Sequence, residues 1–345
     1  MNRSALLPTL ALATALSLSL SGCLAGENAS DTQAADGGAT EGGELTIDFA
    51  TYNPLSLIIK EQGWLEEELA EQDITVNWVQ SAGSNKANEA LRAGAIDVGS
   101  TAGSAALLAR SNGSPIKAID IYSQPEWAAL VTLPDSGIAS VEDLRGKSIA
   151  ATRGTDPYFF LLQALEAAGV DQSEVTIENL QHADGRAALA SGAVDAWSGL
   201  DPIMAAAEQD GAELFFRDID FNTYGFLNAT EDFLEEKPDV AQTVVDAYEK
   251  AREWAKENPE ETAAILAEVA AIDPAIAESV IIDRTNLDVD PAPGDAQRSV
   301  LEKIGPVFVE TGDVKSQEEI DEALDSLFDA SLVESADPAS IGSDS

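Results

Sequence analysis

The stretch Glu89–Gly99 (EALRAGAIDVG) decides the fold, because its pattern returns later in the chain as Ala187–Trp197 (AALASGAVDAW). In each copy a segment with helical spacing of apolar residues ends at a glycine, and a short apolar run with an aspartate follows. Glycine is typical of the C-terminal end of a helix. Asp97 and Asp195 hold equivalent places, and we expect both to have a structural role. The recurrence predicts two α/β units of similar build.

Strands and helices alternate around the first copy, which is typical of a mostly parallel sheet covered by helices. A glycine, Gly63, interrupts the first helix near Trp64. The expected strands are Glu44–Ala50, Ile74–Val79, Ala95–Gly99, Ile116–Tyr122 and Ala128–Leu133. The expected helices are Leu55–Leu69, Lys86–Ala93 and Ser104–Arg110.

The alternation starts again around the second copy. Asp156 is expected as the N-cap of a helix with Pro157 in its first turn, which ends at Ala168 before Gly169. Asp184 is expected to cap the next helix. The other expected helices are Val141–Leu144, one from about Pro202, and most of the chain from Glu231 onward. The expected strands are Ser148–Thr152, Val175–Leu180, Val194–Trp197, Glu213–Phe216 and Tyr224–Asn228.

The order of these elements predicts two lobes with a cleft between them, a design suited to closing on a small ligand. The second lobe is inserted in the first, and the chain crosses between them near Leu133 and Phe221. Segments rich in Gly, Ala, Ser and acidic residues predict a linker and a frayed tail. The expected boundaries are 1–23 for a signal peptide, 24–43 for a flexible linker, 44–133 plus 222–334 for lobe 1, 134–221 for lobe 2, and 335–345 for a disordered tail.

Residues 1–23 have the pattern of a secretory signal. Arg3 precedes an apolar run, Leu6 to Leu20, that is short for a membrane span. The run ends in LSGC, which resembles the bacterial lipobox, whose cysteine is lipidated. Cys23 is the only cysteine of the chain, so an internal disulfide is excluded. We expect an extracytoplasmic protein held to the cell membrane only by lipid on Cys23, in a periplasm or on the outer face; an ordinary secretory signal is the alternative.

The charge is extreme, with 62 acidic residues against 19 Lys and Arg and a net charge of −43. Nucleic acid is excluded as a partner, because phosphate backbones are bound by basic patches. The acidic residues are spread along the chain, which resembles proteins of salt-loving organisms. At about 1 M salt the screening length is roughly 3 Å, so self-repulsion nearly vanishes. We expect a halophilic protein that loses stability at low salt; a chance excess of acid is the alternative.

Three segments together resemble one known family. They are Gly83–Gly99, Val141–Ala150 (VEDLRGKSIA) and Asp184–Trp197, in this order behind the lipobox. The chain resembles the ABC-transporter substrate-binding lipoproteins for aliphatic sulfonates, taurine and nitrate, and most of all the sulfonate binders. The resemblance implies a type II, periplasmic-binding-protein-like fold, capture of a small organic anion, and ABC permease and ATPase subunits as partners. We expect the protein itself to be a monomer.

Helix N-termini at the carboxyl ends of strands are the expected anion-binding groups, because they carry unpaired N–H groups and about half a positive charge. Ser100–Ser104 is the foremost such cradle, and Arg153 could pair with an anion. Aromatic side chains near predicted strand ends or crossings, Trp127 and Tyr122 among them, would enclose the apolar part of the ligand. The expected ligand-binding residues are Tyr52, Asn53, Ser84, Thr101, Gly103, Ser104, Gln124, Thr155, Tyr158, His182, Trp197 and Tyr224.

Several of these residues have a plainer interpretation. Asn53 fits an Asn-Pro turn, Trp197 fits a core position, and His182 fits a surface or capping position. Asp156 is a difficulty, because a carboxylate would repel a nearby sulfonate. Either Asp156 turns away, or it recognises a cationic or hydroxyl part of the ligand, which keeps zwitterions and heterocycles open.

An enzyme on the same two-lobed fold, acting in cofactor-precursor biosynthesis, is the alternative function, together with a binding protein for a heterocyclic vitamin or pyrimidine precursor. A surface adhesin or a sensor is a third. We expect no catalytic residue and no cofactor, because the chain has one histidine, no spare thiol and no Walker-type phosphate loop. We also expect no metal site, since no His/Cys cluster is present.

Overall fold

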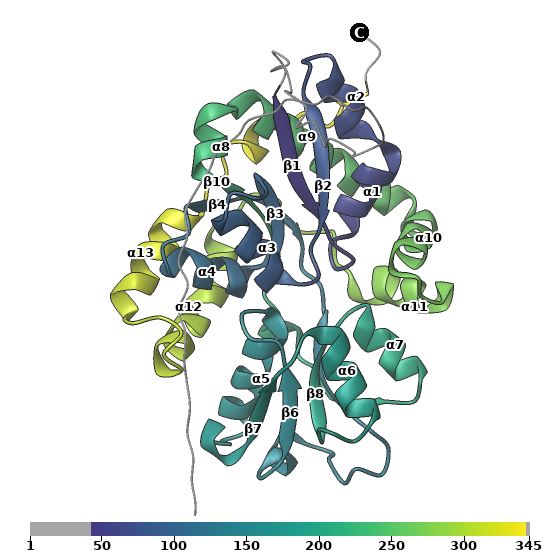
Figure 1. Ribbon diagram of the computed structural model, residues 1–345, viewed down its shortest axis with the longest axis vertical. Coiled ribbons are helices and arrows are strands. Elements are labelled where there is room, and N and C mark those ends of the chain that lie inside the picture. Colours follow the sequence, from purple (N-terminus) through teal and green to yellow (C-terminus); the bar gives the residue numbers. More distant parts are fainter. Residues whose placement is uncertain (1–42, 343–345) are drawn as a thin grey trace, which may run out of the picture. The chain divides into compact units, whose positions relative to one another are not determined.

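The computed structural model describes residues 43–342, in which two five-stranded sheets are the framework (Figure 1). The first sheet has the order β2-β1-β3-β10-β4. β1 pairs in parallel with β2 and β3, whereas β10 runs antiparallel to β3 and β4. The bounds are Glu44–Phe49 for β1, Thr75–Gln80 for β2, Val98–Ala102 for β3, Ile116–Ser123 for β4 and Gly225–Thr230 for β10.

The second sheet repeats this arrangement in the order β7-β6-β8-β5-β9. β6 pairs in parallel with β7 and β8, and β5 runs antiparallel to β8 and β9. The bounds are Ala128–Thr132 for β5, Ser148–Ala151 for β6, Thr176–Asn179 for β7, Ala196–Leu200 for β8 and Glu213–Phe216 for β9. We call the part built on the first sheet lobe 1, and the part built on the second sheet lobe 2.

Helices follow the strands and cover the sheets. In lobe 1 they are α1 (Pro54–Gln62), α2 (Trp64–Ala70), α3 (Ser84–Arg92), α4 (Gly103–Ser111), α8 (Glu231–Glu236), α9 (Pro238–Glu257), α10 (Pro259–Ala270), α11 (Pro274–Glu278), α12 (Asp295–Glu310) and α13 (Gln317–Leu327). In lobe 2 they are α5 (Asp156–Ala167), α6 (His182–Ala190) and α7 (Ile203–Gln209). Gly63 separates α1 from α2 with φ 68°, a left-handed conformation that glycine adopts without strain.

The two copies of the repeated pattern make the same backbone contacts. Asp97 accepts a hydrogen bond from Thr46 N at 2.8 Å, and Asp195 accepts one from Ser148 N at 2.8 Å. The backbone N–H groups of Asp97 and Asp195 donate in turn to the carbonyls of Thr46 and Ser148. Each aspartate therefore joins the end of the helix–glycine unit to a parallel strand of its sheet, β1 for Asp97 and β6 for Asp195, which agrees with a structural role.

The expected two-lobed α/β fold is confirmed, with three corrections. Each sheet has two parallel and two antiparallel pairings, so the sheets are mixed and not mostly parallel. β5 belongs to the second sheet, so the first crossing is 124–127 and lies before this strand, whereas the expected boundary was at 133. The second crossing is 217–224.

The C-terminal segment is the third correction, because its described part packs on the protein. Ile341 is 3% exposed, and its carbonyl accepts a hydrogen bond from Lys250 Nζ at 2.6 Å. Burial of an apolar side chain offsets the entropy lost when the segment is ordered. The expected disordered tail therefore does not extend to the described residues 335–342.

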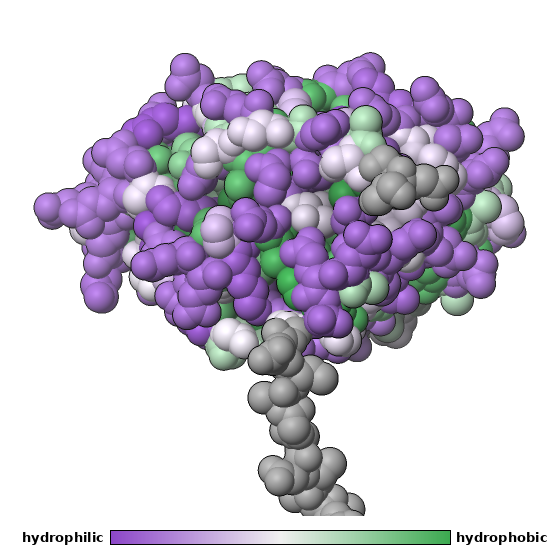
Figure 2. Space-filling view, turned by 90° about the horizontal axis from the view of Figure 1, so that it is seen from above, coloured by the Kyte–Doolittle hydropathy of each residue, from purple (hydrophilic) through white to green (hydrophobic). Residues whose placement is uncertain are grey.

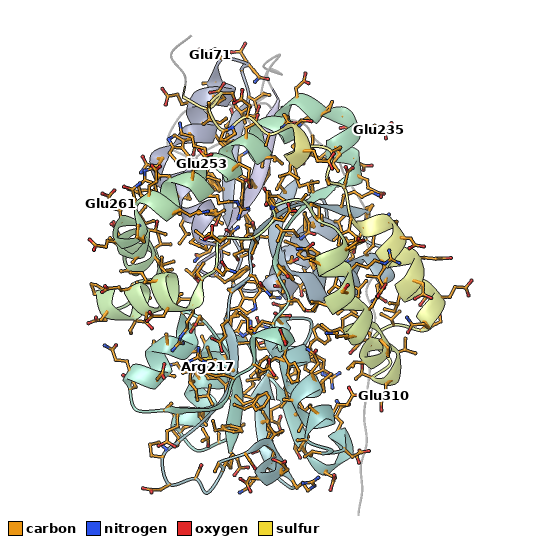
Figure 3. All side chains as sticks on the ribbon, turned by 180° about the vertical axis from the view of Figure 1, so that it is seen from behind. Glu71, Arg217, Glu235, Glu253, Glu261 and Glu310 are labelled. Carbon is orange, nitrogen blue, oxygen red and sulfur yellow. The ribbon has the colours of Figure 1, made fainter. Side chains whose placement is uncertain are left out.

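Acidic side chains lie on many elements. The glutamates labelled in Figure 3 come from helices of lobe 1 and the turn after α2, and the face in Figure 2 consists mainly of hydrophilic residues. Within residues 43–342 no helix is long and apolar enough to span a bilayer. The expected signal segment with Cys23 and the expected linker up to residue 42 lie outside the described residues.

Candidate functional site

A small cavity lies where the two lobes meet. Its lining from lobe 1 includes Ser84 at the start of α3, and its lining from lobe 2 includes Asp156 at the start of α5. The volume is about 10 Å³, close to the room that one water molecule needs. The lobes are therefore closed on each other, and an organic ligand can enter only when they separate. The full lining is Tyr52, Ser84, Ala102, Trp127, Thr155, Asp156, Pro157 and Leu200.

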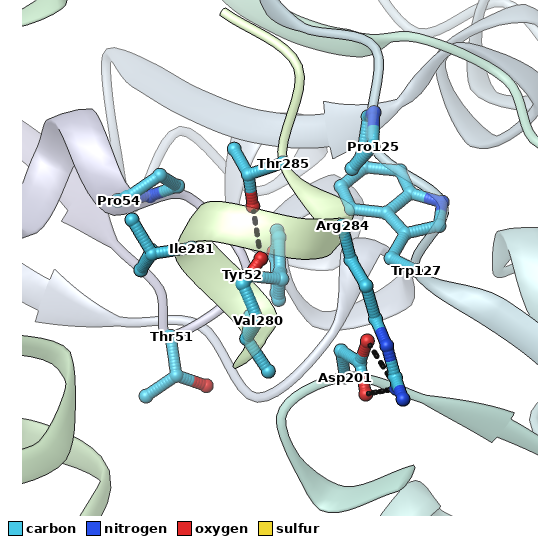
Figure 4. A pocket seen from close by; sticks show the side chains of 10 residues that line it. All are labelled: Thr51, Tyr52, Pro54, Pro125, Trp127, Asp201, Val280, Ile281, Arg284 and Thr285. Atoms are coloured by element: carbon cyan, nitrogen blue, oxygen red, sulfur yellow. Dashed lines mark hydrogen bonds and ion pairs between the residues drawn. The ribbon is translucent and has the colours of Figure 1, made fainter. Parts of the chain in front are cut away.

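A second cavity of about 10 Å³ shares two aromatic side chains with the first (Figure 4). Tyr52 and Trp127 line both cavities, with ring centroids 6.0 Å apart in an edge-to-face arrangement. Arg284 lines the second cavity and contacts Asp201 of lobe 2, with Nη1 at 3.2 Å from both carboxylate oxygens.

The Asp156 carboxylate binds lobe 1 and both crossings. Its Oδ1 accepts hydrogen bonds from Ser104 Oγ at 2.7 Å and Thr223 Oγ1 at 2.6 Å. Its Oδ2 accepts from Trp127 Nε1 at 2.8 Å and Thr223 N at 2.7 Å. Burial raises the pKa of Asp156, and the bonds from Thr223, Ser104 and Trp127 oppose that rise. Asp156 thus neither turns away from the cleft nor remains free for a ligand, because the protein satisfies both oxygens.

The cradle expected at Ser100–Ser104 is also occupied by protein groups. Ser100 N and Oγ donate to Asp48 Oδ1 at 2.8 and 3.0 Å. At the start of α4, Gly103 N donates to the Tyr224 carbonyl at 2.9 Å and Ser104 N donates to Thr223 Oγ1 at 3.0 Å. In this closed form the start of α4 therefore has few donors left for an anion.

Asp48, the acceptor of the two Ser100 hydrogen bonds, is completely buried. Burial raises its pKa to about 7, although hydrogen bonds from Ser81 and Ser100 lower it. Tyr52 OH donates to the Ser100 carbonyl at 3.0 Å, which joins the cavity wall to this polar cluster. Asp48 is thus a buried acid that titrates near neutral pH.

His182, the first residue of α6, lies against the start of α3. A methyl group on Gly83, the residue before α3, would lie 3.1 Å from His182 Nε2. This nitrogen has no hydrogen-bond partner among the described residues, although the side chain is only 2% exposed. Burial lowers the pKa of His182 to about 4. A neutral imidazole therefore faces the N-terminus of a helix in the other lobe.

The structure brings five of the expected ligand-binding residues to this region. Tyr52, Ser84 and Thr155 line the first cavity, Ser104 contacts Asp156, and His182 faces Gly83. The Oγ atom of Ser84 accepts from Ala102 N at 2.9 Å, and Thr155 Oγ1 donates to the Thr152 carbonyl at 2.6 Å. These hydroxyl groups serve the backbone in the closed form.

Other expected residues lie away from both cavities. Asn53 caps α1 by accepting from Ser56 N, and its Nδ2 donates to Tyr248 OH at 3.1 Å. Trp197 is 1% exposed and packs among apolar residues of lobe 2 that include Val131 and Leu189. Asn53 is therefore a helix cap and Trp197 is a core residue, as the alternative interpretation of each predicted.

The remaining expected residues have similar backbone or packing roles. Thr101 Oγ1 donates to the Ala102 carbonyl, and Gln124 N donates to the Asn286 carbonyl. Tyr158 is buried against Phe159, and its ring lies 5.4 Å from the Arg153 guanidinium. Gly103 and Tyr224 bond each other, and neither lines a cavity.

The residues missed by the sequence interpretation are Thr223, which lies in the second crossing, and Arg284. Thr223 holds Asp156 together with Trp127, and Arg284 joins lobe 1 to Asp201. Position in a crossing was the available signal, because a crossing residue must contact both lobes. Thr223 and Arg284 carry no local motif, and their partners are distant in sequence.

Comparison with known proteins identifies the family. Residues 57–262 match the family model described as NMT1/THI5 like, which is more than half of the chain. The chain belongs to this NMT1/THI5-like family. A relative in Bacillus subtilis (strain 168) bears the name aliphatic sulfonates-binding protein. It is 30% identical to this chain over 235 residues, which are 67% of this chain and 70% of the relative.

Solved structures of similar fold extend the picture of this NMT1/THI5-like protein. The alkanesulfonate-binding protein SsuA from Xanthomonas axonopodis pv. citri, bound to MOPS, is 23% identical with a TM-score of 0.73, covering 81% of this chain and 97% of SsuA. The desulfurization enzyme DSZB is 15% identical with a TM-score of 0.62, covering 85% of this chain and 98% of the enzyme. The fold is thus shared by binding proteins and an enzyme.

Proposed function

We propose that the chain is the extracytoplasmic solute-binding protein of an ABC importer and that it binds a small organic anion, such as an aliphatic sulfonate, between its lobes. One observation carries the proposal. The starts of α3 and α5 line one cavity from opposite lobes, and the start of α6 lies against the residue before α3. Helix N-termini favour negative charge and supply N–H donors. The family and its sulfonate-binding relatives support the same function.

Ligand capture follows from hinge motion about the two crossings. With the lobes apart, the helix starts are accessible to solvent; with the lobes together, they surround a common space. A ligand that contacts both lobes stabilises the closed form by its differential affinity for that form. The closed form then docks on the permease, and the ATPase subunits drive release.

Isothermal titration of the purified protein tests this function. Ethanesulfonate, MOPS, taurine and nitrate are titrated separately in phosphate buffer, because common sulfonate buffers would compete. We expect saturable binding of at least one sulfonate with a stoichiometry near one. The absence of binding and of any change in tryptophan fluorescence with all four compounds would contradict the proposal.

An enzymatic function is the second candidate, favoured by the likeness to a desulfurization enzyme. His182 is the only histidine and Cys23 the only cysteine of the chain, so the usual bases and nucleophiles are scarce. Mass spectrometry of a bound sulfonate recovered after long incubation separates the two functions. Recovery of the unchanged sulfonate supports binding alone, and release of sulfite or another product supports the enzyme.

Attachment to the membrane through lipid on Cys23 is part of the proposal. The sequence LSGC at residues 20–23 supports it. A Cys23→Ser variant should appear in the soluble extracytoplasmic fraction, whereas the parent chain should sediment with membranes. Equal distribution of the two proteins would contradict attachment through this residue. Gel filtration of the soluble variant tests the expected monomer.

A further inference from the structure

We propose that His182 and the N-terminus of α3 together bind the oxyanion group of the ligand, and that His182 takes up a proton from solvent when the ligand binds. This inference rests on the proposed function, since it specifies how an anion is held in the same cleft. It assigns to the only histidine of the chain a role as a charged ligand contact, which appears only in the liganded protein.

The hydrogen bonds of Thr152 define the tautomer of His182. Thr152 Oγ1 donates its one proton to the Leu180 carbonyl at 2.7 Å. The same oxygen lies 3.2 Å from His182 Nδ1 and must therefore accept from Nδ1–H. The neutral imidazole then carries a lone pair on Nε2. A proton added at Nε2 makes an imidazolium, because Nδ1–H remains bonded to Thr152.

His182 Nε2 faces a site that suits an anion. It lies beside Gly83, and the first two residues of α3, Ser84 and Asn85, follow directly. The first N–H groups of an α-helix have no partner within the helix, so α3 presents donors and positive potential at this point. Asn85 Oδ1 also lacks a hydrogen-bond partner among the described residues, and a half-turn of its carboxamide would present Nδ2–H.

Glycine at position 83 leaves room for this contact. A β-carbon there would lie 3.1 Å from His182 Nε2 and 3.0 Å from Asn85 Oδ1. The backbone of Gly83 is extended, with φ 162°, so another residue could adopt its conformation. A side chain at position 83 would therefore be unfavourable for steric reasons, because its β-carbon would occupy the space between His182 Nε2 and the start of α3.

The start of α4 is a poorer site for the anion in the closed form. Its first amides bond Tyr224 and Thr223, and Ser104 Oγ bonds the Asp156 carboxylate. A sulfonate there would also meet the negative charge of Asp156. The α3 site lacks the first of these obstacles, and the buried Nε2 of His182 beside it has no partner among the described residues. Asp156 lines the same cavity as Ser84, but four hydrogen bonds from the protein already engage its carboxylate.

No charged side chain contributes to the lowered pKa of His182, for which burial is the only cause. Lys86 is paired with Glu89, and Arg186 with Asp210. An anion against Nε2 would be the first counter-charge of the imidazolium, and it would raise the pKa of His182. The charged groups on α3, α6 and α7 are Lys86, Glu89 and Arg92, then Asp184 and Arg186, then Glu208; Asp210 follows α7 directly, and Arg153 and Asp156 follow β6.

The test is titration with ethanesulfonate from pH 6 to 9 in phosphate and Tris buffers, whose ionisation enthalpies differ. We expect up to one proton taken up per ligand, with affinity falling by up to about tenfold per pH unit between the pKa of His182 in the unliganded protein, about 4, and its raised pKa in the complex. In His182→Gln, which keeps a neutral amide donor near the place of Nε2, binding should be weaker, with no proton uptake and a flat pH profile.

Gly83→Ala is the second variant, with Gly294→Ala as its control. Gly294 also precedes a helix, and a β-carbon there would meet nothing closer than 3.9 Å. Gly83→Ala should weaken sulfonate binding at least tenfold, with an unchanged denaturation midpoint, and Gly294→Ala should bind as the parent does.

Binding without proton uptake, or a pH profile that survives in His182→Gln, would overturn the role of His182 and leave the proposed function intact. Affinity that rises with pH would also overturn it, because a neutral Nε2 would then accept a hydrogen bond from the ligand. Failure of the parent chain to bind any sulfonate contradicts the proposed function itself, so the two failures are distinguishable.

Discussion

Arg284 Nη1 lies 3.2 Å from both carboxylate oxygens of Asp201 and thereby ties lobe 1 to lobe 2 at the crossings (Figure 4). Both side chains are nearly inaccessible to solvent. Burial raises the pKa of Asp201 to about 6, although Arg284 lowers it. Arg284→Gln should reduce the free energy of unfolding by about 3 kcal/mol, because it leaves a buried carboxylate without its partner. Chemical denaturation at pH 7 measures the change.

Arg217→Gln is the matched control for this prediction. Arg217 makes a bidentate contact with Glu126, but both side chains are partly exposed. Exposed ion pairs contribute about 0–1 kcal/mol. Equal losses in the two variants would show that burial does not set the strength of the Arg284 contact.

Asp156→Asn should favour the open form. The amide group of asparagine would place a donor opposite Trp127 Nε1 or the Thr223 donors, each of which needs an acceptor. An unmade buried hydrogen bond costs about 1–3 kcal/mol. Small-angle scattering should give a larger radius of gyration than for the parent chain. Asp184→Asn, at an exposed position in α6, should have the radius of gyration of the parent chain. An equal increase in both variants would contradict the role of Asp156 in holding the lobes together.

Asp48 should make stability fall between pH 4 and 7. Its pKa is raised in the folded protein, from 3.8 to about 7, so the folded state holds a proton that the unfolded state has lost in this window. The contribution of protonated Asp48 to the free energy of unfolding is fully present below pH 4. It is lost as the pH rises to 7, by at most about 1.4 kcal/mol per pH unit. Asp48→Asn keeps an acceptor for Ser100 and should lack this loss. A stability difference between the two proteins that does not vary with pH would contradict the prediction.

Trp127 should report lobe closure by fluorescence. It lines both cavities and bonds Asp156, so separation of the lobes changes its surroundings. Trp127→Phe should remove most of the ligand-dependent signal. Trp197→Phe should keep it, since Trp197 lies in the core of lobe 2. The reverse outcome would place the ligand-sensitive region at Trp197.

Salt should stabilise the protein. A net charge of −43 destabilises the compact state by self-repulsion, which salt screens. The thermal midpoint should rise by several degrees between 0.1 and 2 M KCl. An unchanged midpoint would contradict the halophilic interpretation and favour a chance excess of acidic residues.

Most strands and helices could be predicted from the sequence, because each pattern is local. Gly63 ends a helix and Gly169 follows one, and both have positive φ angles as their positions require. The third strand begins at Val98 and not at Ala95. Its register depends on Asp97, whose N–H and carboxylate are held by Thr46 of another strand.

Two expected caps were wrong. Thr155 precedes α5 as its N-cap and Asp156 is the first helical residue, whose carboxylate bonds the distant residues Ser104, Trp127 and Thr223 and does not cap the helix. α6 begins at His182, ahead of the expected cap at Asp184. The sequence preferences for helix N-caps predicted that helices start near these positions, but they do not indicate which side chains face the other lobe.

The candidate site was predictable as a region and not as a set of contacts. Helix starts at the carboxyl ends of strands follow from the order of elements, and Ser84, Thr155 and His182 were found in this way. The aromatic residue type alone did not distinguish residues that line a cavity from core residues. Trp127 lines both cavities, whereas Trp197 and Tyr158 are buried and line neither.

One carboxylate accepts all four hydrogen bonds that Asp156 makes with lobe 1 and the two crossings. Movement of that single group breaks all four bonds in the same event, while the Arg284–Asp201 pair is a second, separate contact between the lobes. Opening of the lobes should therefore require the loss of both contacts, and a variant that lacks either one should release its ligand faster after rapid dilution.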